Sequence, residues 1–150
     1  NTTYTQQDFE NVETGDTTEH AIESSSGVTW EATITTVSTS NHILVIPNIN
    51  IVAGDDTTNS RAHLHSYLDK ASGGYNIVYT GTNNVGVYDY GGSGVFSNRN
   101  YTPIFRVSPS FEGLCSFKFT LHPSDATAVF KINYPSTAQY SSITLMEIQG

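Results

Sequence analysis

The residues best suited to site chemistry are two histidines separated by one residue, His63 and His65. In a β-strand, residues two apart point to the same face, so both imidazoles are predicted to lie close enough to share one metal ion. One chain supplies only these two nitrogens, which is fewer than a six-coordinate metal ion takes. The alternative is that His63 and His65 are ordinary polar residues at the surface or at an interface. The spacing leaves both interpretations open.

A second group of candidates lies in a segment rich in Tyr, Asn and Gly. Tyrosine offers a flat apolar ring with a polar tip at low entropic cost, and Asn and Asp form hydrogen bonds with hydroxyl groups. These properties favour recognition of a sugar or a receptor by a loop. Tyrosine is also common in strands, so about half or more of these tyrosines are expected to be packing residues. The candidate receptor-binding residues are Tyr75, Tyr79, Asn83, Asn84, Tyr88, Asp89 and Tyr90.

The sequence carries no signature of catalysis. It has no Gly-x-Ser-x-Gly elbow and no glycine-rich phosphate loop between a strand and a helix. Asp55 and Asp56 lack the repeated oxygen ligands of a calcium loop, which favours an acidic turn. We therefore expect a protein that is not an enzyme and has no cofactor, apart from the metal ion that His63 and His65 could share.

Composition indicates the kind of fold that must position these residues. The chain has 150 residues, enough for one domain with a sizeable core. Its 6 Lys and Arg against 14 Asp and Glu give a net charge of −8, which disfavours binding to nucleic acid or to an anionic membrane. No run approaches the roughly 20 apolar residues of a membrane span, so membrane insertion is not expected. The single cysteine, Cys115, excludes an intrachain disulfide and is expected to be buried.

Alternating apolar and polar residues predict a chain of short strands. In residues 61–69 the apolar side chains occupy one face and the two histidines the other. Residues 42–52 form an apolar run in which Pro47 predicts a bulge or an edge, because proline donates no ladder hydrogen bond. About eight to ten strands with turns roughly every 8–12 residues predict an all-β antiparallel sandwich or jelly roll. We assign it to residues 30–150, with residues 1–29 as an N-terminal arm or the first strands.

The chain ends in an apolar strand-like segment, residues 143–148, which follows a turn rich in Pro and Ser. An apolar end of this kind is expected to be docked inside a sheet. It closes an order of segments that includes Ile-Leu-Val at 43–45, Arg-Ala at 61–62 and Pro-Ser-Asp at 123–125. This order, over roughly residues 31–149, resembles the C-terminal β-sandwich domains of tail-fibre and other virion structural proteins of marine bacteriophages.

The resemblance implies a homotrimer of jelly rolls, similar in outline to tumour necrosis factor and complement C1q. It implies a protein of the virion, with the leading task of a tail-fibre or spike tip that attaches to a host-surface receptor, expected to be a glycan. Its partners would be further copies of itself, other virion proteins and that receptor. Two alternatives stay open, a capsid decoration (cement) protein and a free-standing lectin-like binding module.

Two further expectations depend on the trimer. In trimeric phage spikes and fibres, a His-any-His pair from each chain can meet on the axis and bind iron, and His63 and His65 have that spacing. Those pairs lie in thin intertwined shafts, whereas this pair lies in a globular strand pattern. A trimer also needs a second apolar surface besides the core. The candidates for it are Phe117, Phe119 and Leu121, or Phe130 and Ile132.

Overall fold

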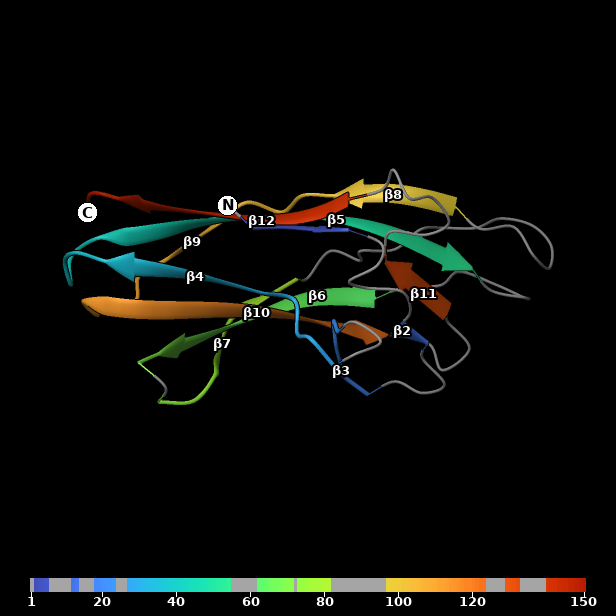
Figure 1. Cartoon of the computed structure of the whole chain (residues 1–150), viewed down its shortest axis with the longest axis horizontal. Coiled ribbons are helices and arrows are strands. Elements are labelled where there is room, and N and C mark those ends of the chain that lie inside the picture. The colour runs from blue at the N-terminus through green and yellow to red at the C-terminus, as the bar shows by residue number, and fades with distance from the viewer. Residues whose placement is uncertain are drawn as a thin grey trace.

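The computed structural model describes residues 2–5, 12–13, 18–23, 27–54, 62–71, 73–81, 97–123, 129–132 and 140–150. These residues form two antiparallel β-sheets that face each other as the two layers of a sandwich (Figure 1). The described part of the chain contains no helix, and so none that is long and apolar enough to cross a membrane. The predicted all-β antiparallel sandwich is confirmed.

The larger sheet is organised around one long strand, β5. One edge of β5 pairs with β12 and then with β11, and its other edge pairs with β9 and then with β8. Outside these, β1 pairs with β12 and β2 pairs with β11. The strands described in this sheet are β1 (Thr2–Thr5), β2 (Val12–Glu13), β5 (His42–Gly54), β8 (Ser97–Tyr101), β9 (Phe105–Val107), β11 (Val129–Ile132) and β12 (Tyr140–Ile148).

The smaller sheet is organised around β10. One edge of β10 pairs with β6, which in turn pairs with β7. Its other edge pairs with β4 and then with β3. The strands described in this sheet are β3 (His20–Ala21), β4 (Glu31–Thr36), β6 (Ala62–Lys70), β7 (Asn76–Thr80) and β10 (Gly113–Pro123).

The connectivity of the described strands is that of a jelly roll. Four times, two strands that are consecutive in sequence lie end to end and occupy one position in the sheet. These are β1 and β2, β3 and β4, β8 and β9, and β11 and β12. When each pair is treated as one strand, the described part of the chain has eight strands, ordered 1-8-3-6 in the larger sheet and 2-7-4-5 in the smaller. This double Greek-key order is one of the ways in which all-β proteins limit exposed sheet edges. Within residues 1–29, the described strands β1, β2 and β3 belong to these two sheets.

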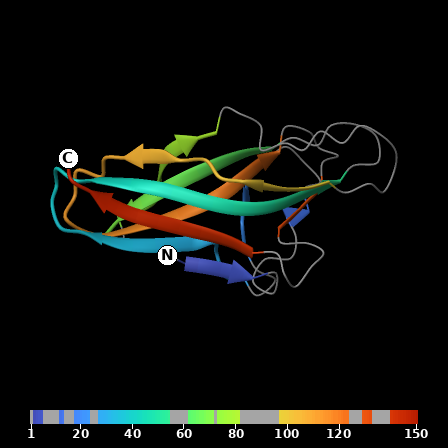
Figure 2. The same cartoon turned by 90° about the horizontal axis from the view of Figure 1, so that it is seen from above.

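Pro47 illustrates how the sequence shapes the larger sheet. β9 pairs with Ile43–Val45 and β8 pairs with Ile49–Ala53, so Pro47 lies opposite the interruption between these two strands. A residue without a backbone N–H is tolerated there, because that edge of β5 has no ladder at this point. The edge predicted from Pro47 is therefore local, within a strand that is otherwise central (Figure 2).

The core fills the space between the two sheets. Trp30 and Phe119 are fully buried, with ring centroids 4.8 Å apart. Cys115 is also buried, as expected. Four candidates for the trimer surface lie in the core instead. Their side chains are almost fully buried, with 0% exposure for Phe117, Phe119 and Leu121 and 1% for Ile132. The side chain of the remaining candidate, Phe130, lies outside the described part of the structure.

Candidate functional site

The side chains of β6 and β10 that point away from the core form a polar surface on the smaller sheet. Its members follow from strand alternation, because their neighbours in sequence are buried core residues. The register sets histidine, tyrosine and charged side chains opposite one another across the two strands. We call this surface the polar face, made up of His63, His65, Tyr67 and Asp69 on β6 and Ser116, Lys118, Thr120 and His122 on β10.

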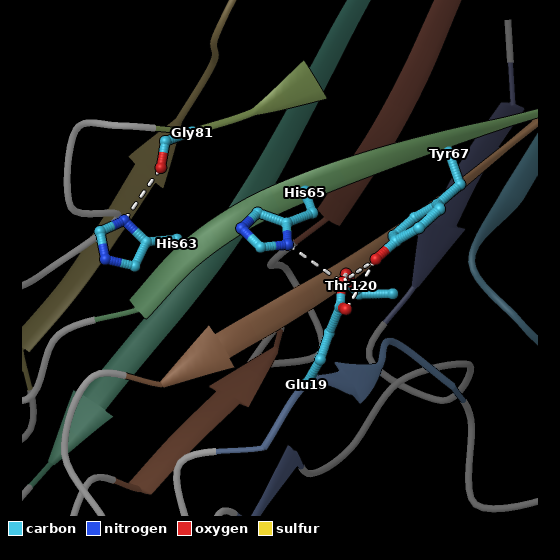
Figure 3. Close-up of polar contacts among 6 residues, drawn as sticks. All are labelled: Glu19, His63, His65, Tyr67, Gly81 and Thr120. Atoms are coloured by element: carbon cyan, nitrogen blue, oxygen red, sulfur yellow. Dashed lines mark hydrogen bonds and ion pairs between the residues drawn. The ribbon is translucent and has the colours of Figure 1, made fainter. Parts of the chain in front are cut away.

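A single carboxylate, that of Glu19, connects the two strands of the polar face (Figure 3). The Tyr67 hydroxyl lies 2.7 and 2.6 Å from its two oxygens, and Nδ1 of His65 lies 3.1 Å from Oε1. The Thr120 hydroxyl also donates to Oε1. Because an ionised carboxylate only accepts hydrogen bonds, Nδ1 of His65 must carry the proton. Glu19 directly precedes β3, so it anchors the entry of that strand to the sheet.

The polar contacts of Glu19 change its acidity and that of its partner. Burial raises the pKa of Glu19, but hydrogen bonds from Thr120, Tyr67 and His65 favour the charged form and lower its pKa overall. Burial and the adjacent carboxylate together raise the pKa of Tyr67 to about 12. At neutral pH the cluster therefore contains a carboxylate and a protonated phenol.

His63 is held in place by the end of β7. Its Nδ1 lies 2.9 Å from the carbonyl oxygen of Gly81, which can only accept a hydrogen bond, so Nδ1 donates. The backbone N–H of Gly81 in turn donates to the carbonyl of Leu64 at 3.0 Å. A Cβ at Gly81 would lie 2.7 Å from that same carbonyl oxygen, so glycine is required for the close approach.

A third histidine, His122, lies near the predicted pair. Its ring centroid is 5.5 Å from that of His65 and 6.5 Å from that of His63. Figure 3 shows the second ring nitrogen of His65 pointing toward the His63 ring, whereas that of His63 points away from His65. Among the described residues, no group of three or more His, Cys, Asp or Glu side chains is arranged to hold a metal ion.

Metal binding by His63 and His65 stays a prediction. The pair shares one strand face, as the spacing indicated, and each Nδ1 donates to an oxygen, which leaves each Nε2 as the available ligand atom. Binding on a trimer axis would require both rings at the surface, and His65 is only 7% exposed. The observed contacts thus favour His65 as a structural partner of Glu19.

Tyr75 joins the polar face at the Lys118 position. The Lys118 Nζ lies 4.3 Å from the ring centroid of Tyr75 and 5.4 Å from that of Tyr67, so the ammonium group interacts with both rings. The Tyr75 hydroxyl forms hydrogen bonds with Glu31 and Ser116. Burial, followed by the interaction with Glu31, raises the pKa of Tyr75 to about 12.

The other described tyrosine of the predicted receptor-binding group lies elsewhere. Tyr79 stacks on Phe105 of the larger sheet, with ring centroids 4.2 Å apart and an interplanar angle of 11°. It also forms a hydrogen bond with Tyr101. Tyr79 therefore packs between the sheets, on the opposite side of the smaller sheet from Tyr75. Five members of the group lie outside the described residues, namely Asn83, Asn84, Tyr88, Asp89 and Tyr90.

Several residues of this site were missed by sequence reasoning, among them Glu19, Lys118, Thr120 and His122. Lys118, Thr120 and His122 alternate with the buried side chains of β10, so the strand pattern could have placed them on the outer face. Glu19 lies 46 positions before His65 and 101 before Thr120. No local sequence pattern predicts contacts between residues so far apart in the chain.

Comparison with known proteins gives a likeness in fold only. No protein-family model matches the chain. No curated protein matches it either. Among solved structures, it is similar to a chain from the structure of infectious bursal disease virus Gx strain, with 11% identity and a TM-score of 0.49 over 99% of this chain. A chain from the Gt strain of that virus gives 13% identity and a TM-score of 0.46, also over 99% of this chain. The protein spans 38% and 37% of the lengths of those two chains.

Proposed function

We propose that the protein is a non-enzymatic structural component of a bacteriophage virion, and that its polar face attaches the particle to a glycan on the host surface. Two features support this proposal. The jelly roll agrees with the architecture that the segment order of the sequence implies. The observation that carries the binding role is the grouping of Tyr67 and Tyr75 around Lys118 on an outer sheet face.

The chemistry of this group suits a sugar. Carbohydrates present apolar C–H faces that pack against aromatic rings, and hydroxyl groups that form hydrogen bonds with carboxylates and ammonium groups. Tyr75 supplies a ring, and Lys118 and Glu31 supply polar atoms beside it. The carboxylates of Glu19, Glu31 and Asp69 outnumber the one ammonium group here, which disfavours acidic sugars. We therefore propose a neutral glycan as the ligand.

Attachment by this face would be multivalent. A shallow surface on an open sheet makes few contacts with one sugar, so each copy would bind weakly. Several copies on one particle, in the proposed homotrimer and across fibres, would raise the apparent affinity by making later contacts intramolecular. The proposal thus needs no deep pocket.

A glycan array tests the ligand. The wild-type protein, displayed multivalently, is expected to bind neutral glycans in preference to sialylated or sulfated ones. Tyr75→Ala should reduce binding at least tenfold, because it removes the ring and the contact with Lys118. Tyr79→Phe is the matched control and should bind like the wild type, since Tyr79 lies between the sheets. Binding unchanged in a folded Tyr75→Ala variant would contradict the assigned face, and release of sugar products would contradict the non-enzymatic role.

Electron microscopy of the intact particle tests the location. Antibody raised against the domain, followed by gold labelling, is expected to mark the distal end of the tail or its fibres. Label distributed over the head shell would instead identify a capsid decoration protein and would overturn the attachment role.

A further inference from the structure

The outer side of the larger sheet differs in character from the polar face. On β5, Ile43 and Val45 point into the core at 0% exposure, so their neighbours Leu44 and Ile46 point outward. On β12, Ile143 is buried in the core, and Met146 lies outward, paired with Leu44. We call this surface the apolar face, made up of Leu44, Ile46, Met146 and Ile148.

The apolar face is open in the described structure. Met146 is 48% exposed, and the other three members are half-buried by their neighbours within the sheet. Figure 2 shows β5 and β12 from above, and no described element lies over them where they pair with each other. Apolar side chains gathered on an outer sheet face are typical of a surface that another molecule covers.

The distribution of charge indicates which molecule this is. The chain carries a net charge of −8, so two copies repel each other wherever carboxylates meet. Among the described residues, the outward side chains around the apolar face include no carboxylate, and the one charged group is Arg106, which pairs with Leu44 in the register. The polar face, in contrast, is bordered by Glu19 and Glu31. A second copy therefore meets the least repulsion at the apolar face.

We infer that copies of this chain associate through the apolar face, with Met146 near the centre of the contact. The ladder of β5 with β12 runs over seven residue pairs. At about 3.3 Å per residue and 4.8 Å per strand, these two strands cover about 220 Å². A standard interface takes roughly 800 Å² per partner, so the apolar face forms the centre of the contact and polar residues around it form the rim. An interface with so small an apolar centre is expected to dissociate at micromolar concentrations.

Static light scattering over a concentration series tests this inference. The wild-type protein at tens of micromolar is expected to give a multiple of 16.3 kDa, three times this mass for the proposed trimer. Met146→Glu and Met146→Lys should each weaken association at least tenfold, because both place a charge in the contact. Agreement between the two variants would exclude an effect of net charge alone.

Leu114→Glu is the matched control, since Leu114 is 50% exposed on the smaller sheet. It should keep the mass of the wild type, and circular dichroism should show that all variants are folded. A wild-type monomer at 100 μM would overturn the inference. An unchanged mass for both Met146 variants, or equal dissociation of Leu114→Glu, would do so too. The inference bears only on the self-assembly part of the proposed function, because monomeric Met146→Glu should still bind a glycan with its polar face at single-site affinity.

Discussion

At the scale of single residues, Glu19 shows how one side chain can organise a surface. Its carboxylate accepts hydrogen bonds from β6 and from β10, and it leads directly into β3. Hydrogen bonds to a charged group are stronger than those between neutral groups, and their geometry here fixes the tautomer of His65. The aromatic and cationic part of the polar face lies beside this cluster through Tyr67, which contacts both Glu19 and Lys118.

Replacing Glu19 by Gln is expected to lower the free energy of unfolding by about 1 kcal/mol at pH 7. The expected loss of stability is no larger because about a third of the Glu19 side chain (32%) is exposed, and solvent screens its interactions. The pKa of Glu19 is lowered from 4.5 in the folded state, so its carboxylate stabilises the fold above about pH 4.5. This contribution disappears as the pH falls through the folded-state pKa.

Urea unfolding at pH 7 and at about pH 2 measures both effects. The difference between wild type and Glu19→Gln should be present at pH 7 and should shrink at the acidic pH. Glu112→Gln, at an exposed position, is the control and should change stability by less than about 0.5 kcal/mol at either pH. An equal difference at both pH values would show that the charge of Glu19 does not contribute.

At the scale of elements, the terminal strand β12 is an internal part of the larger sheet. It pairs with β5 on one side and with β1 on the other, and its Ile143 is fully buried. Its apolar pattern thus has two causes, which are core packing on one face and the open apolar face on the other. Sequence reasoning found the first cause, because an apolar chain end needs a docking site. It did not separate core from interface, since strand alternation labels two faces without saying what covers each.

Deleting residues 143–150 is expected to abolish folding. The truncation would remove six of the seven β12 residues that pair with β5 and would remove the buried side chain of Ile143 from the core. Circular dichroism should show loss of the β-sheet signal, and urea should produce no cooperative transition. Deleting only residues 149–150, which lie beyond the end of β12, should leave a cooperative transition. A folded protein lacking residues 143–150 would show that β12 is dispensable.

At the scale of the whole molecule, the two sheets share one hydrophobic core. Buried residues of the larger sheet, such as Ile49, belong to the same cluster as Phe119 and Trp30, which pack on the smaller sheet. Neither sheet can bury its inner face alone, so the sandwich is expected to fold as a single cooperative unit.

Phe119→Ala tests this cooperativity. It should lower the free energy of unfolding by about 3–5 kcal/mol, because it leaves a cavity beside Trp30. Fluorescence of Trp30, the single tryptophan, and far-ultraviolet circular dichroism should give the same midpoint in urea for the wild type. Both midpoints should move together in the variant. Leu114→Ala, at an exposed position, should change the stability by less than about 1 kcal/mol. Separate midpoints for the two probes would indicate that the sheets unfold independently.

The sequence by itself determined the all-β class, the main strands and the outward direction of His63 and His65, because strand alternation and turn residues are local properties. It also indicated that the terminal strand is docked and that Cys115 is buried. Only the tertiary structure decided that Tyr75 and Tyr79 lie on opposite faces, that Phe117 and Phe119 belong to the core, and that Glu19 joins the polar face. These outcomes depend on which strands become neighbours, and pairing between residues a hundred positions apart leaves no periodic trace in the chain.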